Sequence, residues 1–319
     1  MRGFFYLNAR RLILPFLILF IVLPVSAQSR TLTFVSNVSD QLGGGRDLGI
    51  TCGPYMFFGD TFDGVSTDNG PAGNWLAPNS GAVIVGHRGD GTPVLNALNG
   101  PFAPLFQPTV GAITVTPTGC IVAHGAVYLW YMEIQSNAGH DFQAIGGGIA
   151  ASFDGGLTWA KHPIVPGDNP GTQAALVAAG GYAYALGTES GRTGYAVVGR
   201  APLSRILERD SWRWWDGEGW NATTGGSGIP VIPGPVGEIG LCDNGLWQAA
   251  YMSPEYGGIV LRRAARLTGP WSDAEVILPW GEPGGEAWGT YAPQPFGVCG
   301  VDWLISSFPR YSVERWRLE

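Results

Sequence analysis

Two aspartates near the start of the chain have the residue type and spacing that acid–base chemistry requires. Asp47 comes shortly before an apolar segment, 50–58, and Asp60 follows that segment after one glycine. Hydrolysis of a glycosidic bond uses such a pair: one acid protonates the leaving oxygen and one carboxylate acts at the anomeric carbon. The competing interpretation is structural, with Asp60 capping a turn and Asp47 paired with Arg46. We predict Asp47 and Asp60 as catalytic residues.

Other acids and aromatic residues are candidates for supporting roles. Glu238 opens a predicted strand, where a partly desolvated site would favour the protonated form that a general acid needs. A solvated acid at a strand start explains the same residue. Contacts with substrate are predicted for Glu189, His140, Asp141, Trp288 and Tyr291.

The usual cofactor, nucleophile and metal signatures are absent from the sequence. There is no G-x-x-x-x-G-K-[ST] phosphate loop, no G-x-S-x-G elbow and no H-E-x-x-H motif. The four histidines have no ligand-like spacing. We therefore expect no cofactor and no catalytic metal, while a structural calcium is left open.

The composition indicates the kind of fold that must position these residues. The chain has 319 residues, 45% of them hydrophobic and only 13% charged, which argues against disorder. Its 50 glycines and 24 prolines exclude a helical bundle. A turn-rich, all-β protein remains.

Five segments share one design: a short apolar strand, a tight turn and a second strand. They are 50–58, 120–134, 174–187, 238–252 and 296–308. Hairpins repeated at roughly 50 to 70 residues in an all-β chain suggest propeller blades. No linker divides the chain, so we predict one domain over 28–319, a five-bladed β-propeller whose innermost strands line a central channel.

A further motif favours the same architecture. Residues 152–159 read S-F-D-G-G-L-T-W, which resembles the Asp box of sialidases and other propellers. In such a turn Asp154 bonds nearby backbone amides and Trp159 packs beneath the hairpin. We assign both residues structural roles.

The N-terminal segment predicts export. Three arginines precede an apolar run over 12–25, and small residues surround Ala27, as in a signal peptide over 1–27. A membrane anchor is the weaker alternative, because the run is shorter than a bilayer span. Cleavage near Ala27 would change the net charge from −7 to −10 by removing three arginines and no acid. We expect a secreted monomer (periplasmic, cell-wall or extracellular) that binds neither nucleic acid nor membrane.

Export would place the four cysteines in an oxidising compartment. Three pairings are possible, and joining neighbouring repeats favours Cys52 with Cys120 and Cys242 with Cys299. Four buried thiols are an equally acceptable interpretation.

Several of these motifs together resemble one bacterial family. D-L-G-I, F-F-G-D-T-F, the Asp box, G-E-I-G and Y-A-P are similar to five-bladed propellers long known as a domain of unknown function and now associated with endo-D-arabinanases, glycoside hydrolase family 183. The resemblance runs from about Thr31 to Leu318 and implies cleavage of D-arabinan in mycobacterial arabinogalactan and lipoarabinomannan. It places Asp47 and Asp60 on the D-L-G and G-D-T motifs. Glu238 matches less well, because Ile239 and Gly240 follow it where the family usually has a serine.

Two other functions remain open at this point. A catalytically silent propeller that binds carbohydrate or another surface has the same strands and turns. A glycosidase of another linkage, such as a sialidase, is less favoured because no arginine cluster for a substrate carboxylate can be recognised.

Overall fold

The computed structural model describes residues 30–64, 70–138, 141–221, 228–281, 289–308 and 310–319. Within these ranges the chain is all-β, with no α-helix and three short 3-10 helices, η1 (Ser39–Leu42), η2 (Leu203–Arg205) and η3 (Arg209–Ser211). No helix in the described part of the chain is long and apolar enough to cross a bilayer. The predicted signal peptide, 1–27, lies outside the described residues.

Five antiparallel sheets and one small ribbon make up the structure. The first sheet contains β2 (Ile50–Cys52), β3 (Tyr55–Phe58), β6 (Ser80–His87) and β7 (Pro93–Ala97). The second contains β8 (Thr114–Ala123), β9 (Ala126–Ala138), β10 (Asp141–Ser152) and β11 (Ala160–Pro166). The third contains β12 (Gln173–Ala179), β13 (Tyr182–Thr188), β14 (Val197–Pro202), β15 (Arg213–Trp215) and β16 (Trp220–Asn221). The fourth contains β17 (Ile239–Asp243), β18 (Trp247–Ser253), β19 (Gly258–Ala264) and β20 (Glu275–Pro279). The fifth contains β21 (Thr290–Phe296), β22 (Asp302–Ser307), β23 (Ser312–Leu318) and β1 (Leu32–Asn37), and the ribbon is β4 (Thr61–Phe62) with β5 (Trp75–Ala77).

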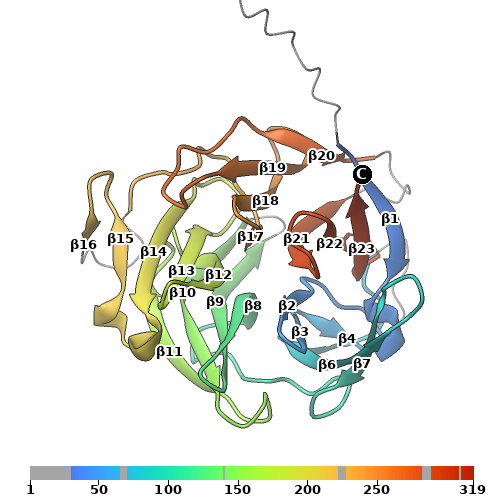
Figure 1. Ribbon diagram of the computed structural model, residues 1–319. Helices are drawn as coiled ribbons and strands as arrows, with labels where there is room; N and C mark the ends of the chain where they lie inside the picture. Colours follow the sequence, from blue (N-terminus) through green and yellow to red (C-terminus); the bar gives the residue numbers. More distant parts are fainter. Residues whose placement is uncertain (1–29, 65–69, 139–140, 222–227, 282–288, 309) are drawn as a thin grey trace, which may run out of the picture.

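The five sheets are arranged around a common centre (Figure 1). Their first strands, β2, β8, β12, β17 and β21, lie innermost, and each contacts the first strand of the next sheet. β21 also contacts β2, so these contacts run completely round the ring. The two ends of the described chain meet in the fifth sheet, where β1 pairs with β23 from Leu32 opposite Leu318.

Four of the five predicted hairpins coincide with the first two strands of a sheet: β2–β3, β8–β9, β12–β13 and β17–β18. The fifth prediction, 296–308, is displaced, because β21 ends at Phe296 and does not begin there. Pro293 and Pro295 lie inside β21, and proline within a strand pattern argues against a strand. The structure accommodates them with a register shift between Tyr291 and Gln294.

Apolar side chains fill the spaces between neighbouring sheets. Trp130 and Trp212 are buried, with ring centroids 5.1 Å apart, and the Trp130 indole donates to the Thr172 carbonyl at 3.0 Å. Trp214 is also buried, whereas Trp215 and Trp220 are partly exposed. Three of these five tryptophans therefore belong to the core.

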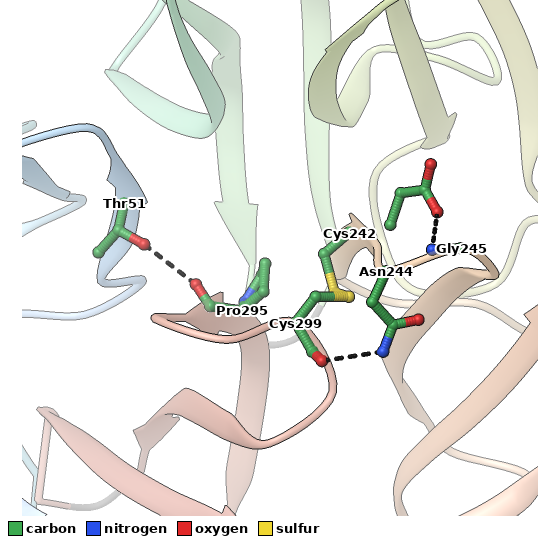
Figure 2. Close-up of a disulfide and its surroundings, with 7 residues drawn as sticks. Thr51, Cys242, Asn244, Gly245, Pro295 and Cys299 are labelled. Carbon is green, nitrogen blue, oxygen red and sulfur yellow. Dashed lines mark hydrogen bonds between the residues drawn. A yellow bond between two sulfur atoms is a disulfide. The ribbon is translucent and has the colours of Figure 1, made fainter.

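Two disulfides join neighbouring sheets at one end of the ring. Cys52 is bonded to Cys120 and Cys242 to Cys299, the pairing favoured from the repeats. Figure 2 shows the second bridge, where Asn244 also donates to the Cys299 carbonyl. Nearby, the Thr51 hydroxyl donates to the Pro295 carbonyl at 3.0 Å and links the first and fifth sheets (Figure 2).

The turn that resembles an Asp box lies between β10 and β11 and is held by its own side chains. One Asp154 oxygen accepts from the Leu157 and Thr158 amides at 3.1 and 2.9 Å, and its other oxygen accepts from the Thr158 hydroxyl. The Trp159 ring packs edge-on against Phe57 of the neighbouring sheet. These contacts are structural, and they lie outside the acid cluster described below.

Candidate active site

The acidic candidates gather at one end of the ring, which we call the acid end. Asp47, Glu238 and Tyr291 lie at the starts of innermost strands. Asp60, Arg192 and Tyr311 come from connections between the second and third strands of three different sheets. Because adjacent strands are antiparallel, a first strand begins at the end where the second strand finishes. Both disulfides lie at the opposite end.

The first hairpin brings Asp47 and Asp60 to matching positions. Ile50 pairs with Phe57 in β2 and β3, and the same register continued three residues outward reaches Asp47 and Asp60. The Gly59 amide donates to the Asp47 carbonyl at 3.1 Å. A side chain at Gly59 would place its Cβ 2.4 Å from Asp47 Oδ1, so glycine is required for this approach.

Asp60 is surrounded by hydrogen-bond donors. Its Oδ1 accepts from the Trp75 indole and from the Thr114 hydroxyl, both at 3.0 Å. The Tyr311 hydroxyl is a further partner. Two donors on Oδ1 leave Oδ2 as the oxygen that is less engaged.

Asp47 has fewer partners. Its Oδ2 accepts from the Tyr291 hydroxyl at 2.9 Å, while Oδ1 is buried with no hydrogen-bond partner among the described residues. Tyr311 is a partner of Asp47 as well as of Asp60. A phenol has one proton to donate, so Tyr311 serves one carboxylate at a time.

These surroundings affect the pKa values of the two aspartates differently. Burial, followed by the negative charge of Asp60, raises the pKa of Asp47 to about 8. Burial also raises the pKa of Asp60, but the bonds from Trp75, Thr114 and Tyr311 act in the opposite direction. Asp60 therefore ionises first, and Asp47 keeps its proton near neutral pH. Two carboxyl groups with divided protonation states are what acid–base catalysis needs.

The alternative interpretation, in which Asp47 pairs with Arg46 and Asp60 caps a turn, does not agree with the observed contacts. Arg46 is fully buried and turns away from Asp47, donating to the Gly43 and Pro101 carbonyls beside the Phe102 ring. Asp60 bonds side chains of distant segments and makes no cap of its own turn in the described contacts.

Glu238 is placed among the same groups, but its partner is a guanidinium. Its Oε1 accepts from Arg192 Nε and Nη2 at 2.9 and 2.7 Å. The Arg192 guanidinium also lies 5.3 Å from the centre of the Tyr291 ring. The two bonds from Arg192 occupy this oxygen, so the geometry favours Glu238 as a positioning residue over the predicted proton donor.

Unusual backbone conformations are concentrated at the acid end. In the described part of the chain, six non-glycine residues have positive φ, and four of them flank or belong to this cluster. The four are Leu48, Arg192, Ala292 and Tyr311, with φ of 74, 62, 49 and 52°. Such conformations cost roughly 1–3 kcal/mol each and tend to occur at functional sites. The strain supports a functional role for this end of the ring.

Removing the guanidinium should destabilise the fold by leaving Glu238 buried and unpaired. We expect Arg192→Met to lower the free energy of unfolding by about 3 kcal/mol at pH 7, as for other buried charges that lose their partner. Arg205→Met is the matched control: its pair with Glu208 is exposed (56% and 53% of each side chain), so its loss should change the free energy of unfolding very little. Urea denaturation of the two variants tests this difference. Equal losses would contradict it, and the double variant R192M/E238L should recover most of the stability.

Only some of the residues predicted to contact substrate lie in the described part of the structure. Glu189 lies in the same connection as Arg192, but packs against Gly194, and burial together with the charge of Asp168 raises its pKa. His140 and Trp288 lie outside the described residues. Asp141 begins β10, and its side chain lies outside the described part of the structure. Tyr291 is therefore the predicted contact residue found within the cluster.

Four cluster members were not anticipated from the sequence: Trp75, Thr114, Arg192 and Tyr311. Arg192 carried a weak signal, since it lies in G-R-T-G after a predicted strand and glycines mark a turn. The other three had no local signal, because each contacts residues of another sheet or connection.

A small cavity continues from Glu238 into the centre of the ring. It is bordered by Leu48, Ile50, Thr118, Gln173, Ala174, Glu238, Ile239, Ala292 and Gln294. The cavity is far too small for a sugar ring, so substrate would meet the cluster from outside. Among the described residues, no group of three or more His, Cys, Asp or Glu side chains could hold a metal ion.

The fold is shared with several solved structures at low sequence identity. A Bacteroides ovatus protein provisionally named a hydrolase aligns at TM-score 0.58 and 16% identity, over 91% of this chain and 87% of the other. A family 117 glycoside hydrolase from Zobellia galactanivorans gives 0.55 and 12%, over 91% and 90%. A GH43_1 enzyme from Xanthomonas citri, solved with xylotriose, gives 0.55 and 12%, over 90% of this chain and 89% of the other. The fold is thus the β-propeller type seen in glycoside hydrolases.

The sequence itself matches one family model over most of its length. Residues 39–317 match the domain of unknown function DUF4185, so the chain belongs to that family. No curated protein matches it.

Proposed function

We propose that this protein is a secreted glycoside hydrolase that cleaves internal linkages of D-arabinan. In this proposal the five sheets are the five blades of a closed propeller, and residues 1–27 are a signal peptide. The ring of contacts among the innermost strands and the pairing of β1 with β23 support the first point. The sequence motifs that resemble endo-D-arabinanases support the choice of substrate.

One observation carries the enzymatic part of the proposal. Asp47 and Asp60 share the Tyr311 hydroxyl, but the charge of Asp60 raises the pKa of Asp47, whereas bonds from Trp75 and Thr114 lower the pKa of Asp60. Asp47, protonated, gives its proton to the leaving oxygen as the glycosidic bond breaks. Asp60, ionised, either attacks the anomeric carbon or removes a proton from the attacking water. Arg192 and Glu238 hold Tyr291 against Asp47 and act as positioning residues.

The direct test is incubation of residues 28–319 with mycobacterial arabinogalactan, followed by chromatography of the released sugars. We expect arabinose oligosaccharides of several lengths, as an internal cut produces. Xylan and β-1,3-galactan are comparison substrates. Release from these alone would keep a glycosidase but reject arabinan, while binding without release would favour the carbohydrate-binding alternative.

The pH dependence of the reaction follows from the protonation of Asp47. Because the acid must carry its proton, kcat/KM should fall as the pH rises through about 8, where Asp47 loses it. The Tyr291 hydroxyl stabilises ionised Asp47 and lowers its pKa, so Tyr291→Phe should move this basic limb to higher pH. Initial rates between pH 4 and pH 10 measure both effects. A basic limb that moves to lower pH in Tyr291→Phe would contradict the assignment.

A further inference from the structure

Trp75 stands out because it joins the acid pair to exposed surface. The ribbon that carries it begins directly after Asp60: β4 starts at Thr61, and β5 returns with Trp75 paired to Phe62. This ribbon is separate from the five larger sheets. The chain therefore leaves Asp60, turns, and comes back to it with a tryptophan.

The Trp75 side chain is held by a hydrogen bond at its indole nitrogen, and much of the rest is exposed to solvent. Its indole nitrogen donates to Asp60 Oδ1 at 3.0 Å, yet 45% of the residue is exposed. A large apolar surface left in water beside a polar cluster is informative, because burial elsewhere would be favourable. The hydrogen bond prevents the ring from turning away from the acid.

We propose that Trp75 is the sugar-binding platform next to the cleaved bond and that it also positions Asp60. The ligand is a sugar ring of the polysaccharide, so the inference rests on the proposed function and deepens it. Flat indole faces suit the C–H face of a sugar, while hydroxyls are bound by polar neighbours. Because the edge of the Trp75 indole is hydrogen-bonded to Asp60, a sugar ring that stacks on the face of the indole lies beside the reacting carbon.

Thr114 allows the two roles of Trp75 to be separated. It donates to the same Asp60 oxygen at the same 3.0 Å, but it is buried and offers no platform. Thr114→Val and Trp75→Phe each remove one hydrogen bond, whereas Trp75→Ala removes the bond and the ring. Because these bonds lower the pKa of Asp60, their loss should move the acidic limb of kcat/KM upward.

The experiment compares the three variants by kinetics and by binding. We expect Thr114→Val and Trp75→Phe to shift the acidic limb to higher pH with little change in KM. Trp75→Ala should show the same shift with KM raised at least about tenfold, or 1.4 kcal/mol. Calorimetric titration of arabinan oligosaccharides into each variant, built on Asp47→Asn, should reproduce the affinity difference. Thermal melts verify that each variant is folded.

The outcomes distinguish this inference from the proposed function. If the wild type releases no sugar, the enzymatic proposal fails, while the titrations still test the platform. Equal affinities of Trp75→Phe and Trp75→Ala would overturn the platform, as would no binding to the parent Asp47→Asn protein. An unchanged acidic limb in both Thr114→Val and Trp75→Phe would overturn the positioning role.

Discussion

Asp60→Asn is expected to lower kcat on the polysaccharide by about a thousandfold or more, with binding nearly unchanged. The amide keeps the shape of the side chain but can neither attack the anomeric carbon nor accept a proton. Asp47→Asn should lose a similar factor because it has no acidic proton for the leaving group. Reducing-end assays give kcat, and titration with oligosaccharides gives affinity.

Asp154→Asn is the matched control for these two variants. It is the same chemical change at an exposed aspartate whose bonds stay within its own turn. The pKa of Asp154 is lowered to about 2, chiefly by its bonds with Thr158, so the change should reduce stability at neutral pH and leave kcat intact. The assignment of the pair fails if Asp154→Asn is as inactive as Asp60→Asn, or if both pair variants retain activity.

Removing both disulfides should have the largest effect on stability. They close loops with sequence separations of 68 and 57 residues, so each contributes about 4 kcal/mol through the unfolded chain. A typical domain has only about 5–15 kcal/mol in total. The variant with all four cysteines changed to alanine is therefore expected to be largely unfolded, and each single-bridge variant to be folded but weakened.

Urea denaturation followed by tryptophan fluorescence measures these differences. The two single-bridge variants serve as controls for each other, since their loops are similar in length. Losses below about 1 kcal/mol for both would show that the bridges add little beyond the contacts between sheets. Activity should survive in a folded single-bridge variant, because both bridges lie at the end of the ring opposite the acids.

The sites of strain suggest why the protein keeps a cluster that costs stability. Leu48 and Ala292 have positive φ, and each directly follows a residue of the cluster. Asp47 Oδ1 is buried without a hydrogen-bond partner among the described residues. A protein selected for stability alone would relax these features. Their concentration at the acid end is consistent with a site prepared for substrate.

The sequence by itself determined what depends on neighbours along the chain. Short apolar runs and glycine turns predict four of the five hairpins, and the first hairpin brings Asp47 and Asp60 to one end through its own register. The repeats also favoured one cysteine pairing, but they left buried thiols equally acceptable, and the structure confirms the pairing. These features are local, so short-range patterns are enough to predict them.

Only the tertiary structure decided what each acid meets. Tyr291 reaches Asp47 across a separation of 244 residues, and Arg192 reaches Glu238 from another sheet. Those contacts exist only when the ring is assembled, so no spacing in the sequence encodes them. They also determine the roles, since protonation depends on burial and on nearby charges. Glu238 therefore became a partner of Arg192 once the fold placed a guanidinium beside it, and Asp47 became the protonated member of its pair.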